Sequence, residues 1–419
     1  MSHFGLVCPP GSSHVTGFTA IARELCQRGH TATAFNTLDI EDLVRREGIR
    51  FWPLGIKTHP KGHFKEFSDK LSQVNGLSAL RFGLKYALNE IEMLLQEAPA
   101  AMRAAGVTAL LIDQVQLAGS TLAEHLGVPF VTICNAVPSD PDTIAPPHVT
   151  NWLPSSSYMS QIRNRMAYRL FDWVATPMRK KINGTRKQWN LKPLHSLYET
   201  YSPILELSQQ TIDFDFPRRY RPSQLSYVGL IHRVGSSNVA FPFERLDGRP
   251  LIYGSLGTVR SDTQGVFRML SEACAALNLQ LVITLGGTGD LAHYTDFPGA
   301  PIVVAYAPQI SILHRSAVTV CHAGNNTVLE SLSCGVPVIA VPLNSDQYGV
   351  AARLTYSGAG ERISLERLST ASFRELLGRI LSDPSYQERA RALSTSIERA
   401  GGVVRAADLI EQKLGKANA

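Results

Sequence analysis

Apolar runs and helix-like stretches alternate along the first third of the chain. An apolar run at residues 3–10, HFGLVCPP, predicts a buried strand, and the stretch 15–30 predicts a helix. Its apolar positions recur at helical spacing: Phe18, Ile21, Ala22 and Leu25. The run TATAF at 31–35 predicts the next strand, and another strand–helix–strand unit follows over 107–134. This alternation is typical of a parallel, doubly wound sheet.

The same alternation begins again at residue 250, with strand-like runs such as PLIYGS, QLVIT and VPVIAVP. Between the two regions, residues 143–216 are mostly helical in period and richer in aromatic residues, prolines and bases. We therefore expect an α/β protein with two doubly wound domains that face a cleft. The expected boundaries are 1–216 for the first domain, 217–248 for a Pro-, Ser- and Gly-rich linker, 249–400 for the second domain, and 401–419 for a final amphipathic helix packing back on the body.

Composition excludes several classes of protein. The 419 residues, 44% of them hydrophobic, suit an enzyme of two or three domains. No run approaches the roughly 18 apolar residues of a membrane-spanning helix, and the N-terminus lacks the pattern of a signal peptide. The six cysteines have no C-x-x-C spacing, which predicts buried free thiols and a cytoplasmic location. No H-E-x-x-H motif is present and no D-x-D cluster of the metal-binding type is recognised, so no metal site is predicted.

The net charge of +6 is mild and predicts no nucleic-acid partner, but the bases are unevenly placed. Residues 161–190 hold eight Lys or Arg and one acid, Asp172, together with several aromatic residues. Two interpretations stay open. The aromatic residues can be core and the bases a solvated face, or the segment 151–190 can make a peripheral contact with an anionic membrane.

Residues 322–347, HAGNNTVLESLSCGVPVIAVPLNSDQ, concentrate polar side chains at two predicted strand ends. The loop HAGNNT precedes a predicted helix, whose N-terminus has unpaired N–H groups and a positive dipole end suited to phosphate. Gly324 allows a close backbone approach. Three side chains in this loop can donate hydrogen bonds to phosphate oxygens: His322, Asn326 and Thr327.

The carboxylates of this stretch suit hydroxyl groups instead. Glu330 lies about one turn into the helix and can accept from ribose hydroxyls, while Asp346 and Gln347 follow the next strand and can hold a sugar. Each residue alone has a structural explanation, such as Asn326 capping the helix. Together, at these spacings, they predict a site for a nucleotide diphosphate with a sugar attached.

Residues 306–347 resemble the donor-binding signature of UDP-glycosyltransferases of the GT-B fold, through Ala-Pro-Gln at 307–309, Gly-Val-Pro at 335–337 and the polar residues above. GSLGT at 254–258 resembles the phosphate loop of that family. A longer resemblance, in MSHFGLVCPPGSSH, DQYGVAARLTYSGAG and AGGVVRAADLIEQ, is to bacterial zeaxanthin glucosyltransferases. The plant form of the family usually has Trp where Tyr306 and Asn325 stand, so stacking of uracil on Tyr306 is a departure from the pattern.

The resemblance implies two Rossmann-like domains and inverting, metal-independent transfer of a hexose such as glucose. The donor is a UDP-sugar co-substrate with no further cofactor, and the acceptor is a lipophilic hydroxyl compound, a carotenoid or a phenol or flavonoid-like molecule. The donor-binding residues implied are Ser255, Thr258, Tyr306, Ala307, Gln309, His322, Gly324, Asn326, Thr327, Glu330, Asp346 and Gln347. The residues expected to contact the acceptor are Ser13, Phe18, Gln114, Trp152 and Asn344.

Transfer requires a base that deprotonates the attacking hydroxyl. His14 follows the first predicted strand at the start of a helix, where the positive helix end should keep the imidazole neutral. Asp113 ends a strand of the same domain and can orient the imidazole. A loop histidine and a helix cap are the structural alternatives, and the position of the base in the resembling family favours the catalytic pair.

Three other functions remain as alternatives. A lipid-linked or natural-product glycosyltransferase has the same fold with another acceptor, and a nucleotide-sugar epimerase has a related architecture. A non-catalytic module can bind a sugar nucleotide without a base. The pairing of His14 and Asp113 with the donor signature disfavours the last two.

Overall fold

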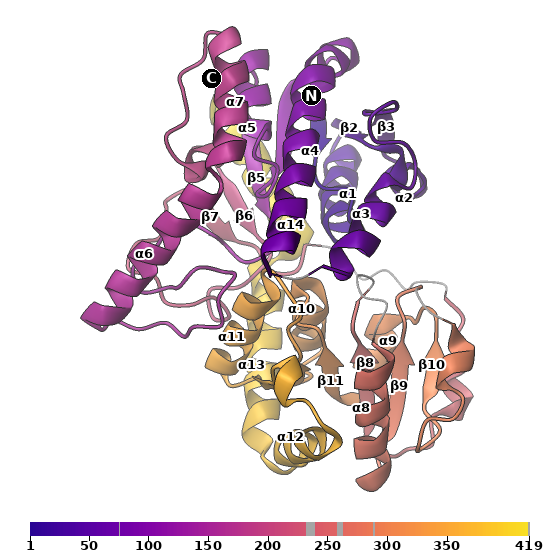
Figure 1. The fold of residues 1–419 in the computed structure, drawn as a ribbon. Coiled ribbons are helices and arrows are strands. Elements are labelled where there is room, and N and C mark those ends of the chain that lie inside the picture. The colour runs from indigo at the N-terminus through magenta and orange to yellow at the C-terminus, as the bar shows by residue number, and fades with distance from the viewer. Residues whose placement is uncertain (75, 232–238, 258–262, 288–289, 418–419) are drawn as a thin grey trace.

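The computed structural model contains a parallel β-sheet in each half of the chain and describes residues 1–74, 76–231, 239–257, 263–287 and 290–417 (Figure 1). The first sheet has the order β3-β2-β1-β4-β5-β6-β7. Its strands are β1 His3–Val7, β2 Thr31–Asn36, β3 Arg50–Pro53, β4 Ala109–Asp113, β5 Phe130–Cys134, β6 Glu206–Ser208 and β7 Leu225–Tyr227. Neighbouring strands pair in parallel throughout.

Helices cover both faces of this sheet, and their apolar sides form two cores. One core joins α1 to the sheet through residues such as Phe18 and Ile21. The other joins α4, α5 and α7 to the opposite face through residues such as Leu94, Leu122 and Ile182. The helices of this half are α1 Ser12–Gln27, α2 Glu41–Arg46, α3 His63–Ser72, α4 Gly76–Ala105, α5 Gly119–Leu126, α6 Tyr158–Val174 and α7 Thr176–Gln188.

The second sheet has the order β10-β9-β8-β11-β12-β13, again with parallel neighbours. Its strands are β8 Leu251–Ser255, β9 Gln280–Thr284, β10 Ile302–Val304, β11 Ser316–Cys321, β12 Val338–Ala340 and β13 Gly360–Arg362. The helices are α8 Gln264–Ala276, α9 Gln309–Leu313, α10 Asn325–Ser333, α11 Gln347–Ser357, α12 Thr370–Ser382 and α13 Pro384–Ala400. The predicted strands of both halves are therefore present, as two Rossmann-like sheets.

The chain around the expected linker differs from the sequence-based division. Strand β7 lies inside 217–248, yet it pairs with β6 and belongs to the first sheet. The first domain thus extends at least through Tyr227, and a range that starts at 217 begins the linker too early. Residues 217–248 look like a linker in sequence because the strand has only three residues among Pro and Ser.

The last helix, α14 Gly402–Ala417, packs against α1 of the first domain rather than on the second domain that precedes it. Its apolar side chains join the core of the first sheet: Val403, Ala406, Ala407, Leu409, Ile410 and Leu414. Arg28 donates to Asp408 and Glu411 of this helix at 2.7 and 2.8 Å. The C-terminus accordingly lies beside the N-terminal half in Figure 1.

In both sheets the chain order reverses between two central strands: β1 and β4 in the first, β8 and β11 in the second. Ligands of doubly wound sheets bind outside the carboxyl ends of the strands at this point. The two domains are held together by a buried ion pair, in which Arg353 of α11 donates to Asp215 at 2.7 Å. Both side chains are about 99% buried, so the loops at the two reversal points have a defined relation to each other.

Candidate active site

His14 and Asp113 meet at the reversal point of the first sheet. His14 lies in the first turn of α1, just after β1, and Asp113 is the last residue of β4, which pairs with β1. The distance from His14 Nδ1 to Asp113 Oδ2 is 2.7 Å. The carboxylate is fully buried, whereas the imidazole is 26% exposed. With Nδ1–H donating to the carboxylate, Nε2 is left as the basic atom at the accessible side.

The protonation of His14 differs from the sequence-based expectation. Burial lowers the pKa of His14, but the Asp113 carboxylate raises it by charge and by hydrogen bonding, with a smaller contribution from Asp346. The net pKa lies above the usual 6.5. The expectation that the helix end keeps the imidazole neutral is therefore wrong, because a buried carboxylate in contact outweighs the partial charge of the helix terminus. His14 becomes a stronger base than a free histidine.

A third residue, Asn135, completes the pair and was missed in the sequence. It follows β5, and its Nδ2 donates to Asp113 Oδ2 at 3.0 Å and to the carbonyl of His14 at 3.4 Å. Its close approach to α1 depends on Gly17, where an added Cβ would lie 2.6 Å from Asn135 Oδ1. The signal available in the sequence was the position of Asn135 directly after a buried strand, next to the strand that carries Asp113.

The reversal point of the second sheet brings Ser255 and His322 together. Cys321 pairs with Ser255 in register, so the loops after β8 and β11 leave the sheet side by side. The imidazole of His322 fills the space beside two glycines: an added Cβ would lie 2.5 Å from it at Gly324 and 2.8 Å at Gly257. Gly324 thus leaves room for the His322 imidazole, whereas the sequence had suggested that it allows a close approach of the backbone.

His322 is a neutral hydrogen-bonding group. Burial lowers its pKa to about 4, although a hydrogen bond to the Ser255 backbone opposes the shift. The residue after it, Ala323, has φ +62°, a conformation that costs a non-glycine residue energy and is concentrated at functional loops. The loop therefore holds an uncharged donor against the start of α10.

The N-terminus of α10 is bound by the first domain through amide side chains. Asn326 Oδ1 accepts from Gln209 at 2.7 Å, and Asn326 Nδ2 donates to the carbonyl of Ser13 at 3.1 Å. Asn325 donates to the carbonyl of Asn135 at 2.8 Å and accepts from Gln210 at 3.1 Å. The predicted role of the Asn326 side chain as a phosphate donor is not what this conformation shows, because both of its polar atoms already hold the first domain.

The backbone N–H groups of the first turn of α10 have no partner within the helix, which is the feature that suits a helix end to an anion. Thr327 lies half-buried in that turn. Glu330, further along the helix, is buried and accepts from the side-chain amide of Gln309, which in turn accepts from the Tyr253 hydroxyl at 2.7 Å. Glu330 and Gln309 thus lie together, as both were predicted at the donor site.

Tyr306 and Ala307 follow β10. The Tyr306 side chain is exposed and lies against Gly287, where an added Cβ would lie within van der Waals overlap of the ring. Ala307 packs half-buried beside a core of the second sheet. Tyr306 thus offers an aromatic face at the edge of the donor region. Thr258, also predicted here, lies outside the described residues.

Asp346 and Gln347 begin α11. Gln347 Oε1 accepts from the backbone N–H groups of Leu343 and Asn344 at 2.8 and 3.1 Å, which fixes the loop before the helix. Burial raises the pKa of Asp346, and the charge of His14 opposes this shift. His14 and Asp346 therefore interact electrostatically across the domain interface, which places the predicted sugar-binding loop near the predicted base.

The residues predicted to contact the acceptor differ in their exposure. Phe18 is not available to a ligand, since it is 99% buried in the core beneath α1, where its helical spacing places it. Gln114 is also buried and donates to the carbonyl of Val137 at 3.2 Å. The ring of Trp152 is covered by the Arg163 guanidinium at 4.2 Å. Ser13 and Asn344 are exposed.

An aromatic group beside His14 was missed in the sequence. Phe64 of α3 lies 3.7 Å from the position of a Cβ at Gly11, and the His14 ring lies 3.6 Å from the same point. Phe64 continues into Phe67, whose ring centroid lies 6.3 Å away. Phe67 then stacks on two side chains of α4, Phe82 at 5.4 Å and Tyr86 at 3.7 Å. An apolar aromatic surface therefore leads away from the base.

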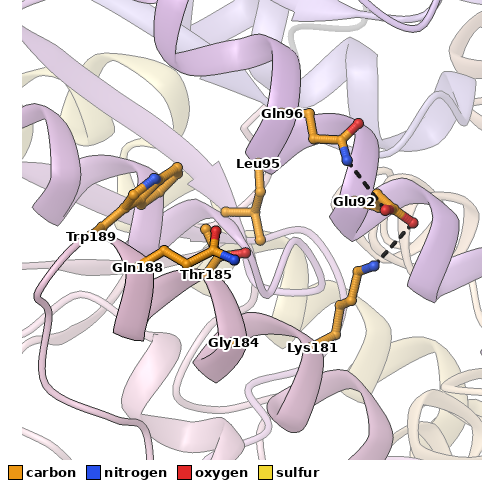
Figure 2. Close-up of a pocket in the computed structure, with 8 residues that line it drawn as sticks. All are labelled: Glu92, Leu95, Gln96, Lys181, Gly184, Thr185, Gln188 and Trp189. Atoms are coloured by element: carbon orange, nitrogen blue, oxygen red, sulfur yellow. Dashed lines mark hydrogen bonds and ion pairs between the residues drawn. The ribbon is translucent and has the colours of Figure 1, made fainter.

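A hollow of about 420 Å³ lies elsewhere, between α4 and α7 (Figure 2). Its lining includes Leu95 and Trp189, and Lys181 pairs with Glu92 at 3.0 Å on one side. None of the described site residues predicted from the sequence lines it. Within the described ranges, no group of three or more His, Cys, Asp or Glu is arranged to hold a metal ion.

Two Rossmann-like sheets, with the His14–Asp113 pair on the first and the N-terminus of α10 on the second, form the arrangement of the GT-B fold. Residues 61–400 match the family model described as UDP-glucoronosyl and UDP-glucosyl transferase. The chain belongs to this family and is a glycosyltransferase.

Two relatives support this family membership, and one solved structure shows the same fold. It is 30% identical over 415 residues to the zeaxanthin glucosyltransferase of Pantoea ananas, covering 98% of this chain and 96% of the relative. It is 32% identical over 421 residues to that of Pseudescherichia vulneris, covering 99% and 98%. The glycotransferase of kitacinnamycin superposes with a TM-score of 0.77 at 20% identity, covering 99% of both chains, which confirms the predicted fold.

The six cysteines are free thiols, as predicted. Four are buried, but Cys26 and Cys334 are only half-buried, so the expectation of burial fails for these two. Among the helices described, none combines the length and apolar character needed to cross a membrane.

Proposed function

We propose that the protein transfers a hexose, glucose in the first instance, from a UDP-sugar to a hydroxyl group of a lipophilic acceptor with inversion at the anomeric carbon. The observation that carries the proposal is the 2.7 Å contact between His14 and the buried Asp113. This pair lies opposite the α10 loop, which Ser13 and Asn135 of the same domain contact directly. The base and the donor loop therefore belong to one site.

In the proposed reaction, the acceptor O–H gives its proton to Nε2 of His14 as its oxygen attacks the anomeric carbon. The bond from that carbon to the diphosphate oxygen breaks, and UDP leaves. Asp113 stabilises the imidazolium that forms, because its carboxylate lies 2.7 Å from His14 Nδ1. The negative charge on the leaving diphosphate is stabilised by the N-terminus of α10, with His322 and Ser255 as uncharged donors. These groups supply the stabilisation without a metal ion or a further cofactor.

The nucleotide and sugar contacts are assigned to the second domain. Glu330 accepts from the ribose hydroxyls, and Tyr306 offers its exposed ring to the uracil. Asp346 accepts from the hydroxyls of the transferred sugar. Gln347 contributes by fixing the loop, given that its side-chain oxygen binds two backbone N–H groups.

The acceptor is assigned to lipophilic alcohols, with a carotenoid diol first and a phenol or flavonoid-like compound second. The aromatic group Phe64, Phe67, Phe82 and Tyr86 supports this class, since it offers stacking surface next to His14. Two relatives that match along nearly the full length are zeaxanthin glucosyltransferases. We propose that the enzyme works in the cytoplasm. Because such a diol is nearly insoluble in water, the enzyme takes its acceptor from a membrane surface without spanning the membrane.

The test measures UDP release from UDP-glucose under three conditions: with a carotenoid diol, with a flavonoid, and with no acceptor. Transfer is expected with at least one lipophilic alcohol, and His14→Ala is expected to lower it by about 10² to 10⁴. UDP binding by that variant, measured by calorimetry, is expected to stay near the wild-type value, since His14 lies in the first domain. A His14→Ala enzyme with normal turnover would overturn the assignment of the base.

A further inference from the structure

The outward side of α6 carries an apolar stripe that the described part of the chain leaves exposed. Met159, Met166, Leu170 and Trp173 are 73%, 65%, 56% and 71% exposed. They are separated by seven, four and three residues, a spacing that puts all four on one face of a helix. Single exposed apolar residues are ordinary, but a continuous stripe of four large ones indicates an interaction surface.

The opposite side of α6 is fixed to the first domain. Asn164 donates to the carbonyls of Thr143 and Ile144 at 3.0 and 3.2 Å, and the Tyr168 hydroxyl donates to the carbonyl of Ala145 at 3.2 Å. Both side chains are buried. Figure 1 shows α6 at the outer edge of the first domain, away from the second sheet. The stripe is therefore held facing outward by the body of the protein.

The charges beside the stripe are positive. Arg165 and Arg169 are exposed, and within the described residues no ion pair engages either of them. Both arginines line a second hollow, of about 330 Å³, together with Asp142 and Asp172. These two acids are already bound: Asp142 accepts from backbone N–H groups, and Asp172 accepts from Arg179 at 2.8 Å. Arg165 and Arg169 thus keep their charge for a partner outside the chain.

The other bases counted between residues 161 and 190 are partly used inside the protein. Arg179 pairs with Asp172, Lys181 pairs with Glu92 at 3.0 Å, and Arg186 is buried against Glu124 at 2.7 Å. The expectation that the whole basic segment faces a membrane is therefore too broad. Within residues 161–190, all of them described, the face of α6 is where exposed apolar side chains lie beside arginines that no ion pair engages.

We propose that this face of α6 docks on an anionic lipid bilayer, with the stripe entering the interface and Arg165 and Arg169 meeting the headgroups. This inference rests on the proposed function, for which the bilayer is the source of the acceptor. Charge favours lipid over a second copy of the chain. Two copies joined through this face would bring their own arginines together, with no exposed acid on α6 to pair with them.

Co-sedimentation with vesicles of phosphatidylcholine containing phosphatidylglycerol tests the proposal. The wild type is expected to bind these vesicles, to bind more weakly as salt rises, and to bind pure phosphatidylcholine much less. Arg165→Gln with Arg169→Gln is expected to lower the partition coefficient by roughly thirty-fold, about fivefold for each base. Leu170→Ser with Trp173→Ser is expected to weaken binding even at low salt.

Matched controls lie on the second domain, where Arg374→Gln with Arg399→Gln removes the same charge from exposed positions, and Leu381→Ser removes an exposed leucine. Equal loss of binding in these controls would overturn the assignment to α6. No vesicle binding by the wild type at low salt would overturn the docking itself. So would sedimentation showing a dimer that Leu170→Ser dissociates, since the stripe would then join two copies.

The outcome is separable from the proposed function. Transfer to a water-soluble phenol measures catalysis without a membrane, and the α6 variants are expected to keep it. Catalysis without vesicle binding would refute the docking alone. Vesicle binding without transfer to any lipophilic alcohol would refute the proposed function alone.

Discussion

Replacing Asp113 by Asn tests the catalytic pair with almost no change in shape. The carboxylate receives three hydrogen bonds: from His14 Nδ1 at 2.7 Å, from Asn135 Nδ2 at 3.0 Å and from the Val115 backbone at 3.1 Å. An amide has one oxygen and one N–H₂ group, so it cannot accept at both ends. Whichever way it turns, its N–H₂ group meets a donor.

Two effects follow from this conflict. At least one buried donor is left unsatisfied, which is expected to lower the free energy of unfolding by about 1–3 kcal/mol. The loss of the negative charge also removes the attraction that raises the pKa of His14, so this pKa should fall. His14 then becomes a weaker and less well oriented base, and turnover is expected to fall by about 10² to 10⁴.

The assay is turnover against pH with saturating UDP-glucose and a soluble phenol. The wild-type rate should rise with pH through the pKa of His14, which lies above 6.5, because the neutral imidazole is the active form. In Asp113→Asn the rise should move to lower pH and reach a lower plateau. An unchanged midpoint together with an unchanged plateau would refute the catalytic role of the pair.

Stability should depend on pH in the opposite sense. Since the folded pKa of His14 is raised above its unfolded value, its contribution to stability is fully present below about 6.5 and is lost as pH rises through the folded pKa. Thermal unfolding of the wild type and Asp113→Asn should therefore differ most at low pH within the range where the fold persists. A difference that grows with pH above 6.5 would contradict the direction of the shift.

Three further predictions concern Gly17, the expected donor residues and the domain contact. Gly17→Ala is expected to lower turnover with little effect on UDP binding, because its Cβ would meet Asn135 Oδ1 at 2.6 Å, and an unchanged rate would show that Asn135 does not position Asp113. Glu330→Ala is expected to weaken UDP binding in calorimetry. Asp346→Ala should leave the affinity for free UDP almost unchanged but raise the KM for the UDP-sugar. Arg353→Met removes one of the two arginines that pair with the buried Asp215, while Arg218 stays at 3.0 Å. It is expected to lower the free energy of unfolding in urea by about 1–3 kcal/mol, and no measurable loss would contradict a rigid domain contact.

Amide contacts between the domains join the start of α10 to the loop that carries His14. Gln209, Gln210, Ser13 and Asn135 of the first domain bind the two asparagines that begin α10. These bonds place the N-terminus of α10 against the loop that carries His14. Any movement that separates the domains must break them, so the position of the α10 N-terminus and the position of His14 are coupled through the same residues.

The sequence could predict the secondary structure, the two sheets and the polar loops at the strand ends. The strands, the two doubly wound sheets and the polar loops at strand ends follow from periodicity, because burial on both faces requires apolar runs and a switch to loops at their ends. The same pattern placed His14 and Asp113 at the ends of two strands of one sheet, and the resemblance to the glycosyltransferase family is what favoured a catalytic role for them. Their 2.7 Å contact is the consequence of β1 pairing with β4 in parallel.

The relations between distant segments were decided by the tertiary structure alone. Asn326 looks like a phosphate ligand in sequence, but Gln209 lies 117 residues away and takes its side-chain oxygen. Phe18 looks suited to an acceptor and is drawn into the core by its helical spacing, while Phe64 reaches the base through helix packing that no local pattern reveals. The pKa of His14 rises for the same reason: it depends on which charges surround the side chain after folding, and sequence spacing does not specify those distances.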